Sequence, residues 1–159
     1  MTMQPVYTAE AAITLTLTSL ADGAWRQSAV VNNTTLLHVD ALVGGSVQTG
    51  TLTAGGSIDF YCYAQYADGP DYTGGASGSD AAYTADGEEL LFKFLGSIIT
   101  DDTDDNRDME FGPWPVAPLF GGNLPQRWGL VVENNTGVAL NATGTNNEVV
   151  YRGQAFQDA

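Results

Sequence analysis

Hydrophobic and polar positions alternate most regularly in residues 127–140. Trp128, Leu130 and Val132 occupy every second position, which places their side chains on one face of a β-strand. The Asn-Asn-Thr-Gly sequence that follows at 134–137 favours a turn, because these residues tolerate left-handed backbone angles. Apolar positions then alternate again. The pattern therefore predicts a β-hairpin with one buried face over residues 127–140.

Similar patterns along the chain predict an all-β fold. A second strand–turn–strand arrangement is expected at residues 30–39, around Asn32-Asn33-Thr34. Strands are predicted at residues 13–18, 24–31, 36–43, 47–52, 58–66, 90–99 and 148–156. Pro113 and Pro115 limit the segment 109–116 to an edge strand at best. Eight or nine short strands separated by turn residues are typical of a two-sheet β-sandwich or a jelly-roll-like single domain.

The chain length fits one domain with a hydrophobic core. It has 159 residues and a hydrophobic fraction of 43%, and a chain of this size and composition can bury a stable interior. Alternation of strands with helices is absent, which argues against a doubly wound sheet. We expect an N-terminal arm at residues 1–11 and the β-sandwich domain at residues 12–157.

Four tyrosines are the clearest candidates for contact with another molecule. Tyr61 and Tyr63 alternate onto the polar face of the predicted strand 58–66, opposite the apolar face that should line the core. Tyr72 and Tyr83 lie in residues 67–89, the longest irregular stretch, and long loops in compact domains are often functional. Because a two-sheet sandwich has one inner face per sheet, these tyrosines predict a subunit interface. The alternative is that a second layer covers them.

Composition excludes several classes of function. The formal net charge is −14, with five Lys and Arg residues together, so the surface should repel nucleic acids and anionic membranes. No apolar stretch is long enough to span a bilayer. Cys62 is the only cysteine, so no intramolecular disulfide can form. The first residues lack the pattern of a secretion signal, and we expect synthesis and folding in a host cytoplasm.

Candidate chemistry is sparse, and we expect no enzyme activity, cofactor or metal. His38 is the only histidine and has no nucleophile motif beside it, so a strand-surface histidine is the favoured reading over a catalytic triad. Cys62 should be buried and unreactive. The acidic residues 101–108 could ligate Ca²⁺, yet they lack the EF-hand pattern, and a solvated loop is favoured. Glu88 and Glu89, or pairs from the acidic loop, could in principle supply the two carboxylates of a glycosidase. The sequence does not fix the distance between such carboxylates, on which this chemistry depends.

Four segments together resemble a known group of proteins: residues 19–28, 40–43, 74–80 and 124–137. The chain is similar to small virion structural proteins of tailed bacteriophages, and in particular to capsid decoration, or cement, proteins. The resemblance covers most of the chain in patches of turn and core residues. It implies a β-sandwich or jelly-roll subunit, often a homotrimer, bound to the outside of the capsid shell, and it carries no catalytic residues to transfer.

We therefore expect a non-enzymatic decoration protein on the capsid exterior that binds the major capsid protein and stabilises contacts between its subunits. Its acidic surface would keep particles dispersed. Expected interface residues are Gln4, Pro5 and Tyr7 in the arm, the tyrosines Tyr61, Tyr63, Tyr72 and Tyr83, and the patch of Trp114 and Phe120. The alternative is a carbohydrate-binding, receptor-binding module of the phage tail or surface. A hydrolase of cell-wall or capsule sugars is the third and weakest possibility.

Overall fold

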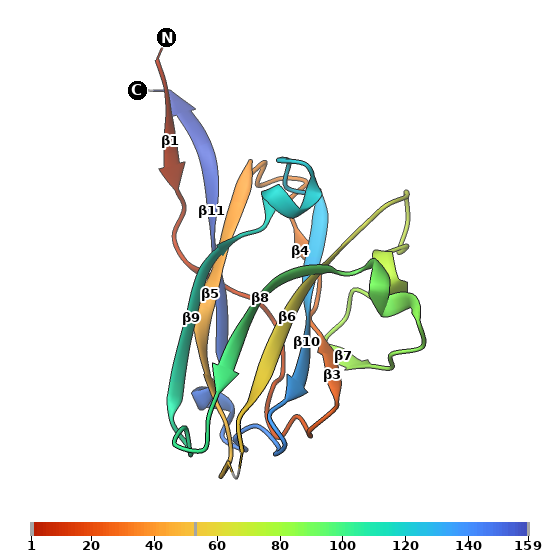
Figure 1. Cartoon of the computed structure of the whole chain (residues 1–159). Helices are drawn as coiled ribbons and strands as arrows, with labels where there is room; N and C mark the ends of the chain where they lie inside the picture. Colours follow the sequence, from red (N-terminus) through yellow and green to blue (C-terminus); the bar gives the residue numbers. More distant parts are fainter. Residues whose placement is uncertain (1, 53, 159) are drawn as a thin grey trace.

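A computed structural model describes residues 2–52 and 54–158 as two antiparallel β-sheets packed face to face (Figure 1). Residue 1 of the predicted arm lies outside the described residues. The prediction of an all-β, two-sheet sandwich is confirmed. No helix in the described ranges is long and apolar enough to cross a membrane.

The first sheet has the strand order β1-β11-β5-β9, and β2 also pairs with β11. Its strands are β1 (Met3–Tyr7), β2 (Ala11–Ala12), β5 (Asp40–Gln48), β9 (Asp108–Pro115) and β11 (Glu148–Asp158). The strand containing Pro113 and Pro115 lies at the sheet edge, as predicted, because proline cannot donate to a central ladder. The long strand β11 therefore connects the N-terminal strand to the rest of this sheet.

The second sheet has the order β7-β3-β10-β6-β8, and β4 also pairs with β10. Its strands are β3 (Trp25–Gln27), β4 (Val31–Asn32), β6 (Gly56–Ala64), β7 (Ala81–Tyr83), β8 (Lys93–Thr100) and β10 (Arg127–Asn135). Four short 3-10 helices lie in the connections: η1 (Thr73–Gly75), η2 (Glu88–Leu91), η3 (Ala117–Phe120) and η4 (Gly144–Asn146). Along the chain, most consecutive long strands alternate between the two sheets.

The predicted hairpin at 127–140 is wrong in its second half. β10 ends at Asn135, and Leu140 instead forms an isolated bridge with Thr49. The Asn134 side chain donates hydrogen bonds to the carbonyls of Leu20 and Val138 at 2.9 and 2.7 Å, which turns the chain away from β10. The strand is also buried on both faces, because Val131 is as inaccessible as Leu130.

Other strand boundaries also differ from the predictions. Residues 13–18 form no strand, although Ile13 and Leu17 are buried as their alternation predicted. This segment crosses between the sheets, since the Ile13 N–H donates to Val149 and the Ala29 N–H donates to the Thr14 carbonyl. The hairpin expected at 30–39 and the strands expected at 36–43 and 47–52 are replaced by β4, a turn and the single strand β5. The last strand, β11, extends through Asp158, two residues beyond the predicted end at residue 156, because these residues pair with β1.

Residues 67–92, called the cover segment, form a third layer over part of the second sheet (Figure 1). Tyr63 and Tyr72 are buried there, with ring centroids 5.4 Å apart, and Val131 lies in the same cluster. Tyr61 and Tyr83 are half-buried beside it. The expectation of outward-facing tyrosines is therefore wrong for Tyr63 and Tyr72, and Tyr61 and Tyr83 are only partly exposed. The chain supplies its own covering layer, which is the alternative that the sequence left open.

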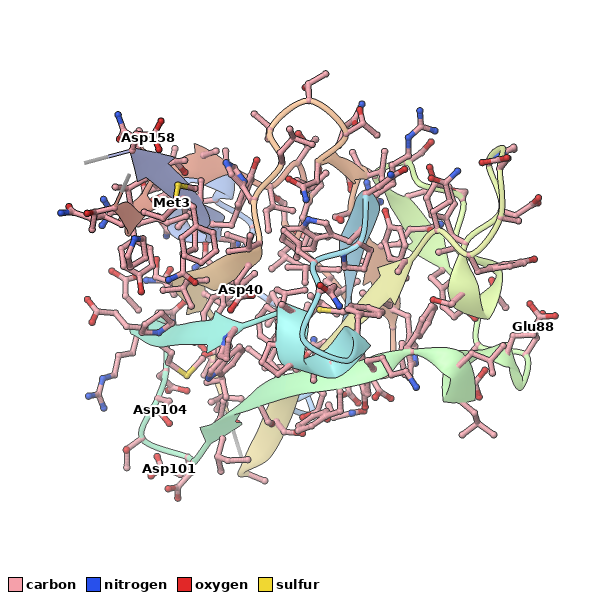
Figure 2. The ribbon with its side chains drawn as sticks, turned by 90° about the horizontal axis from the view of Figure 1, so that it is seen from above. Met3, Asp40, Glu88, Asp101, Asp104 and Asp158 are labelled. Atoms are coloured by element: carbon pink, nitrogen blue, oxygen red, sulfur yellow. The ribbon has the colours of Figure 1, made fainter. Side chains whose placement is uncertain are left out.

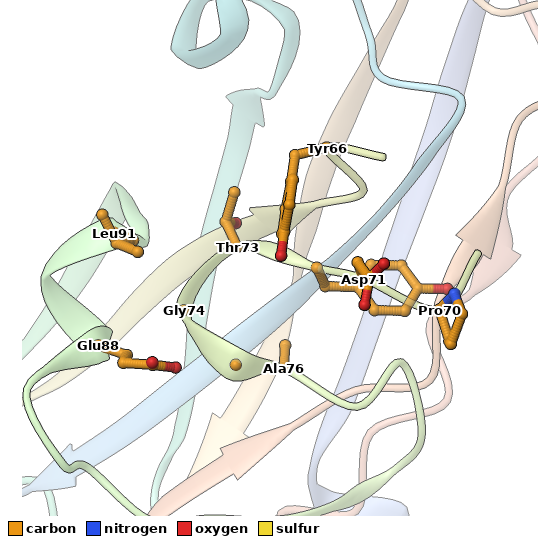
Figure 3. A pocket seen from close by; sticks show the side chains of 10 residues that line it. Tyr66, Pro70, Asp71, Thr73, Gly74, Ala76, Glu88 and Leu91 are labelled. Atoms are coloured by element: carbon orange, nitrogen blue, oxygen red, sulfur yellow. The ribbon is translucent and has the colours of Figure 1, made fainter. Parts of the chain in front are cut away.

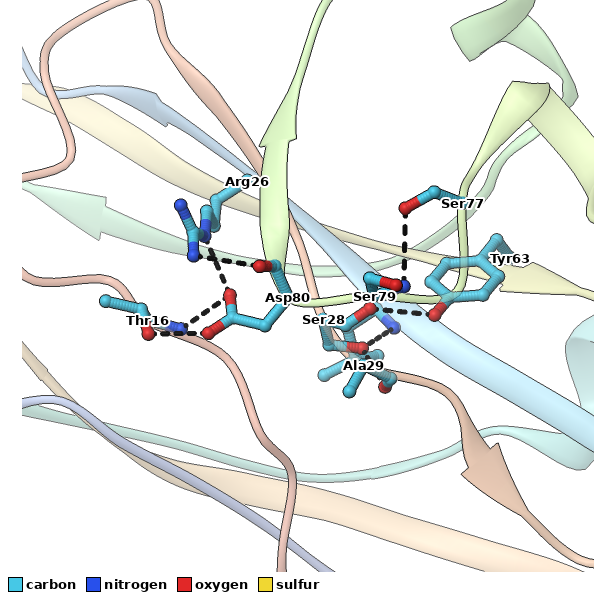
Figure 4. Close-up of polar contacts among 9 residues, drawn as sticks. Thr16, Arg26, Ser28, Ala29, Tyr63, Ser77, Ser79 and Asp80 are labelled. Carbon is cyan, nitrogen blue, oxygen red and sulfur yellow. Dashed lines mark hydrogen bonds and ion pairs between the residues drawn. The ribbon is translucent and has the colours of Figure 1, made fainter.

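Polar contacts fix the cover segment to the sheet (Figure 4). The Arg26 guanidinium donates to the Asp80 carboxylate at 2.7 Å, and the Thr16 hydroxyl donates to the same carboxylate at 2.6 Å. Burial opposes ionisation of Asp80, but these hydrogen bonds outweigh it and hold the pKa of Asp80 below its ordinary value. The ionised carboxylate thus links three segments that are distant in sequence.

Asp80→Asn should lower the free energy of unfolding by about 1–3 kcal/mol at pH 7, because it removes charge-assisted hydrogen bonds from a half-buried site. The folded pKa lies below the unfolded one, so this stabilisation is complete above the unfolded pKa and is lost as the pH falls through the folded pKa. The difference between wild type and variant, measured by urea denaturation, should shrink below about pH 4. The exposed substitution Asp102→Asn is the control, and an equal effect from it would contradict the account.

Candidate interaction surface

β1 and the last residues of β11 form a two-stranded ribbon that projects beyond the body of the sandwich (Figure 1). The ribbon comprises residues 3–7 and 154–158, paired from Met3 opposite Asp158 to Tyr7 opposite Gln154. Seen from above, Met3 and Asp158 lie at one end of the molecule and Glu88 of the cover segment lies at the other (Figure 2). Isolated two-stranded ribbons are marginally stable in water, so the projecting ribbon is a candidate for contact with a partner.

One side of the ribbon carries a row of exposed apolar residues. Residues directly opposite each other in an antiparallel pair share a face, and alternate residues along a strand do too. The pairing therefore places Met3, Pro5, Tyr7 and Phe156 on one side, which we call the ribbon face, beside Gln154 and Asp158. Val6 and Ala155 lie on the other side and are partly buried. Met3, Tyr7 and Phe156 are 55%, 54% and 55% exposed. Four neighbouring apolar side chains are thus left in solvent, as at many interaction sites.

The ribbon face continues into a groove of about 750 Å³ on the outer surface of the first sheet. Tyr7 lies at the junction, and Leu42, Val150 and Pro113 supply further apolar lining. Glycines line the groove where β5 and β9 shift register, so no side chains fill the space there. A Cβ atom at Gly45 would lie 2.0 Å from the Glu148 carbonyl oxygen, so no larger residue fits there without moving the backbone.

The charges around this surface are mostly negative. Glu10, Glu110 and Glu148 line the groove, and Arg152 is the one basic residue among its lining residues. The Arg152 Nε–H donates to the Thr8 carbonyl at 3.2 Å, which holds the guanidinium near the base of the ribbon. An apolar strip bordered by carboxylates suits a partner that presents apolar and basic side chains.

The predicted interface residues fall into three groups. Gln4, Pro5 and Tyr7 lie in the ribbon, with Pro5 and Tyr7 on its apolar face. Trp114 and Phe120 form no exposed patch, because both are half-buried and pack on the core. The four tyrosines belong to the cover segment and the sheet beneath it, on the other sheet of the sandwich. Sequence reasoning missed Phe156. The alternation of residues 149–156 places Phe156 on the opposite face of the strand from Tyr151, which could have marked it as exposed.

His38 and Cys62 have structural surroundings. His38 is buried and lies on no strand, so the expectation of a strand-surface histidine is wrong. A Cβ atom at Gly153 would lie 2.0 Å from its Nδ1 atom, and burial lowers the pKa of His38. Cys62 is buried as predicted, and burial raises the pKa of its thiol. Neither side chain opens onto the groove.

The acidic candidates also bind their own loops. In residues 101–108, Asp101 accepts hydrogen bonds from Thr103, and Asp104 accepts from the Arg107 guanidinium at 3.2 Å. Within residues 2–52 and 54–158, no group of three or more His, Cys, Asp and Glu side chains could hold a metal ion. The carboxylates of Asp101 and Asp104 therefore stabilise the loop through hydrogen bonds within it.

A hollow of about 490 Å³ in the cover segment is lined by Glu88, one of the two adjacent glutamates considered as a glycosidase pair (Figure 3). Glu88 lines it together with Tyr66, Asp71 and Leu91. The Glu89 carboxylate instead accepts a hydrogen bond from the Gly87 N–H at 2.6 Å. The adjacent glutamates therefore do not converge on one space.

Comparison with known proteins adds no relative to this geometry. No family model, no curated protein and no solved structure matches the chain.

Proposed function

We propose that this chain is a non-enzymatic decoration protein of a tailed-bacteriophage capsid. Its ribbon face and the adjoining groove bind the outer surface of the shell, and each copy bridges neighbouring major capsid protein subunits. The observation that carries the proposal is the projecting apolar ribbon, because Met3, Tyr7 and Phe156 remain more than half exposed in the single chain. A partner that covers them gains apolar burial and fixes a marginal ribbon.

Charge favours a different protein over a second copy as the occupant of this surface. Two copies meeting through the same face would bring Glu10, Glu110 and Glu148 of both chains together, and like charges placed opposite each other oppose association. Each chain also carries a net charge of −14. The major capsid protein would therefore supply apolar and basic groups, and many copies on one particle would add avidity to modest single contacts.

The strand order supports a virion role, although many functions share one architecture. In the first sheet, β11 lies between β1 and β5, so the first and last strands of the chain are neighbours. In the second sheet, β10 lies between β3 and β6. This interleaved order is consistent with a jelly roll, an architecture found in viral capsid and lectin domains. We infer a jelly-roll subunit from it.

The homotrimer remains part of the proposal, with its contacts away from the buried tyrosines. Tyr66, which directly precedes the cover segment, is 70% exposed, and Leu90 and Leu91 within the segment are 85% and 57% exposed. Tyr66 and Leu91 line the same hollow, and Leu90 and Leu91 lie in η2 with Glu88, which Figure 2 places at the end of the molecule opposite Met3 and Asp158. Subunits that associate there would leave the ribbon face of each copy free for the shell.

Phe156→Ala should weaken binding to undecorated capsids at least about 10-fold, because removal of a central aromatic anchor commonly costs 2 kcal/mol or more. Binding is measured by cosedimentation of the purified protein with shells from which the chain is absent. Wild-type protein should also raise the temperature at which these shells rupture. The matched control is Phe94→Ala, since Phe94 is 53% exposed and Phe156 is 55% exposed, but Phe94 lies on the other sheet.

Two results would overturn the proposal. Wild-type protein could fail to bind the shells at micromolar concentration, which excludes decoration. Alternatively, Phe94→Ala could weaken binding as much as Phe156→Ala, which would exclude the ribbon face as the contact.

A further inference from the structure

We propose that the outer surface of the second sheet binds neutral saccharides. This site lies on the opposite sheet from the ribbon face and goes beyond capsid attachment. It consists of two neighbouring rows of side chains across β3, β10, β6 and β8, which we call the platform: Trp25, Glu133, Asp59 and Ser97 in one row, and Tyr61 and Phe94 in the other.

Aromatic rings form the apolar part of the platform. The rings of Trp25 and Tyr61 are stacked with centroids 5.4 Å apart, and Phe94 meets Tyr61 edge-on at 5.6 Å. Trp25 and Tyr61 are half-buried, whereas Phe94 is 53% exposed. The cover segment packs against this cluster through Tyr83, whose ring centroid lies 6.2 Å from that of Trp25, yet Trp25 and Tyr61 stay partly exposed. A line of ring surface is therefore open to a ligand.

Two carboxylates lie directly beside these rings. Glu133 and Asp59 are paired residues on adjacent strands, so their Cβ atoms are about 5 Å apart. Burial and the Asp59 charge raise the pKa of Glu133, and burial and the Glu133 charge raise the pKa of the Tyr61 hydroxyl. Ionised carboxylates are hydrogen-bond acceptors only, so a ligand that contacts this pair must bring donors.

The carboxylate of Asp59 is held in place by neutral donors. It accepts hydrogen bonds from the hydroxyls of Ser97 and Ser57 at 2.5 and 3.0 Å and from the Asn135 amide at 3.3 Å. Hydroxyl and amide groups both donate and accept. The polar side of the platform therefore matches a ligand whose own groups do both.

These features together select the ligand class. No residue of the two rows carries positive charge, so anionic glycans and phosphates are disfavoured. A cation could also lie on the rings, but the Asp59 carboxylate already accepts hydrogen bonds from the neutral donors Ser57, Ser97 and Asn135, which stabilise its charge without a cationic ligand. A neutral sugar ring presents apolar C–H groups to the aromatic rings and hydroxyls to the carboxylates and amides. It satisfies both halves of the platform.

The platform is flat, so a single site should bind weakly. Recognition would then depend on many copies displayed together, as on a particle, where avidity exceeds the single-site affinity by orders of magnitude. The test must therefore present the protein at high density.

The experiment displays biotinylated protein on streptavidin beads and applies them to an array of neutral glycans, anionic glycans and peptides bearing arginine or trimethyl-lysine. We expect retention on one or more neutral glycans. Phe94→Ala and Asp59→Asn should each reduce it at least about 10-fold, and Phe156→Ala should leave it unchanged. A melting curve for each variant identifies any that fails to fold, and Glu133→Gln then serves as the second probe of the carboxylate pair.

Retention only on anionic glycans or only on cationic peptides would overturn the assignment, as would the absence of any retention. Equal loss in Phe156→Ala would also overturn it, because the ribbon face would then be responsible. Capsid binding is read separately through Phe156, so either proposal can fail while the other holds.

Discussion

Phe60→Ala should lower the free energy of unfolding by about 3–5 kcal/mol, because it removes a large side chain from the core between the two sheets. Phe60 on β6 is completely buried. Its ring centroid lies 4.5 Å from that of Phe111 and 5.5 Å from that of Trp114, both on β9. These contacts join the two sheets, so their loss removes apolar burial and leaves a cavity between the layers. The melting temperature should fall by on the order of 10 °C.

Urea denaturation followed by far-ultraviolet circular dichroism measures this change. Phe156→Ala is the matched control, because it removes the same side chain from a half-exposed position on the ribbon and should cost about 1 kcal/mol or less. Similar losses from both variants would contradict the account of a core between two sheets and a ribbon outside it.

Tyr63→Ala should cost about 3–5 kcal/mol by removing the anchor between the second sheet and the cover segment. The Tyr63 ring is fully buried and edge-on to Tyr72, and its hydroxyl donates to the Ser28 carbonyl at 2.8 Å. A Cβ atom at Gly129 would lie 2.3 Å from this ring, so only glycine leaves room for it. Tyr63→Phe keeps the ring and should cost about 1–2 kcal/mol, because one buried acceptor loses its donor.

Hydrogen exchange distinguishes this layer from the rest of the fold. In Tyr63→Ala, amide exchange should accelerate more in the cover segment than in β5 and β11, since the segment depends on this ring for its packing. Uniform acceleration throughout the chain would mean that the cover segment is no separate layer.

Period-two alternation predicted which side chains face the core, and it did so because one buried face per strand is a local property of the pleat. Ile58, Phe60 and Cys62 are buried as their positions indicated. The same reasoning failed for Tyr63, since residues 67–89, which make up most of the cover segment, were read as an irregular loop. Whether such a segment packs back on its own sheet depends on long-range contacts such as Arg26 with Asp80, and local pattern carries no signal for them.

The turn at 134–137 was also correct locally and wrong globally. Asparagine and glycine indicate that the chain reverses. The direction in which the chain leaves the turn depends on the Asn134 side chain, which donates hydrogen bonds to the carbonyls of Leu20 and Val138.

The ribbon was the least accessible to sequence reasoning. An arm containing Gln4, Pro5 and Tyr7 was expected, but its apolar face exists only because β1 pairs with the far end of the chain. The register of that pairing places Pro5 opposite Phe156, and two segments so distant in sequence share no local pattern. The platform was missed for the same reason, since Asp59 and Glu133 become neighbours only through the pairing of β6 with β10.

The most direct test of the central claim is an electron cryomicroscopy reconstruction of a capsid that carries this chain. The account predicts density for the ribbon, residues 3–7 and 154–158, against the major capsid protein, with Phe94 and the second sheet facing solvent. A reconstruction in which the ribbon points away from the shell, or in which the chain occupies no site on it, would contradict the account.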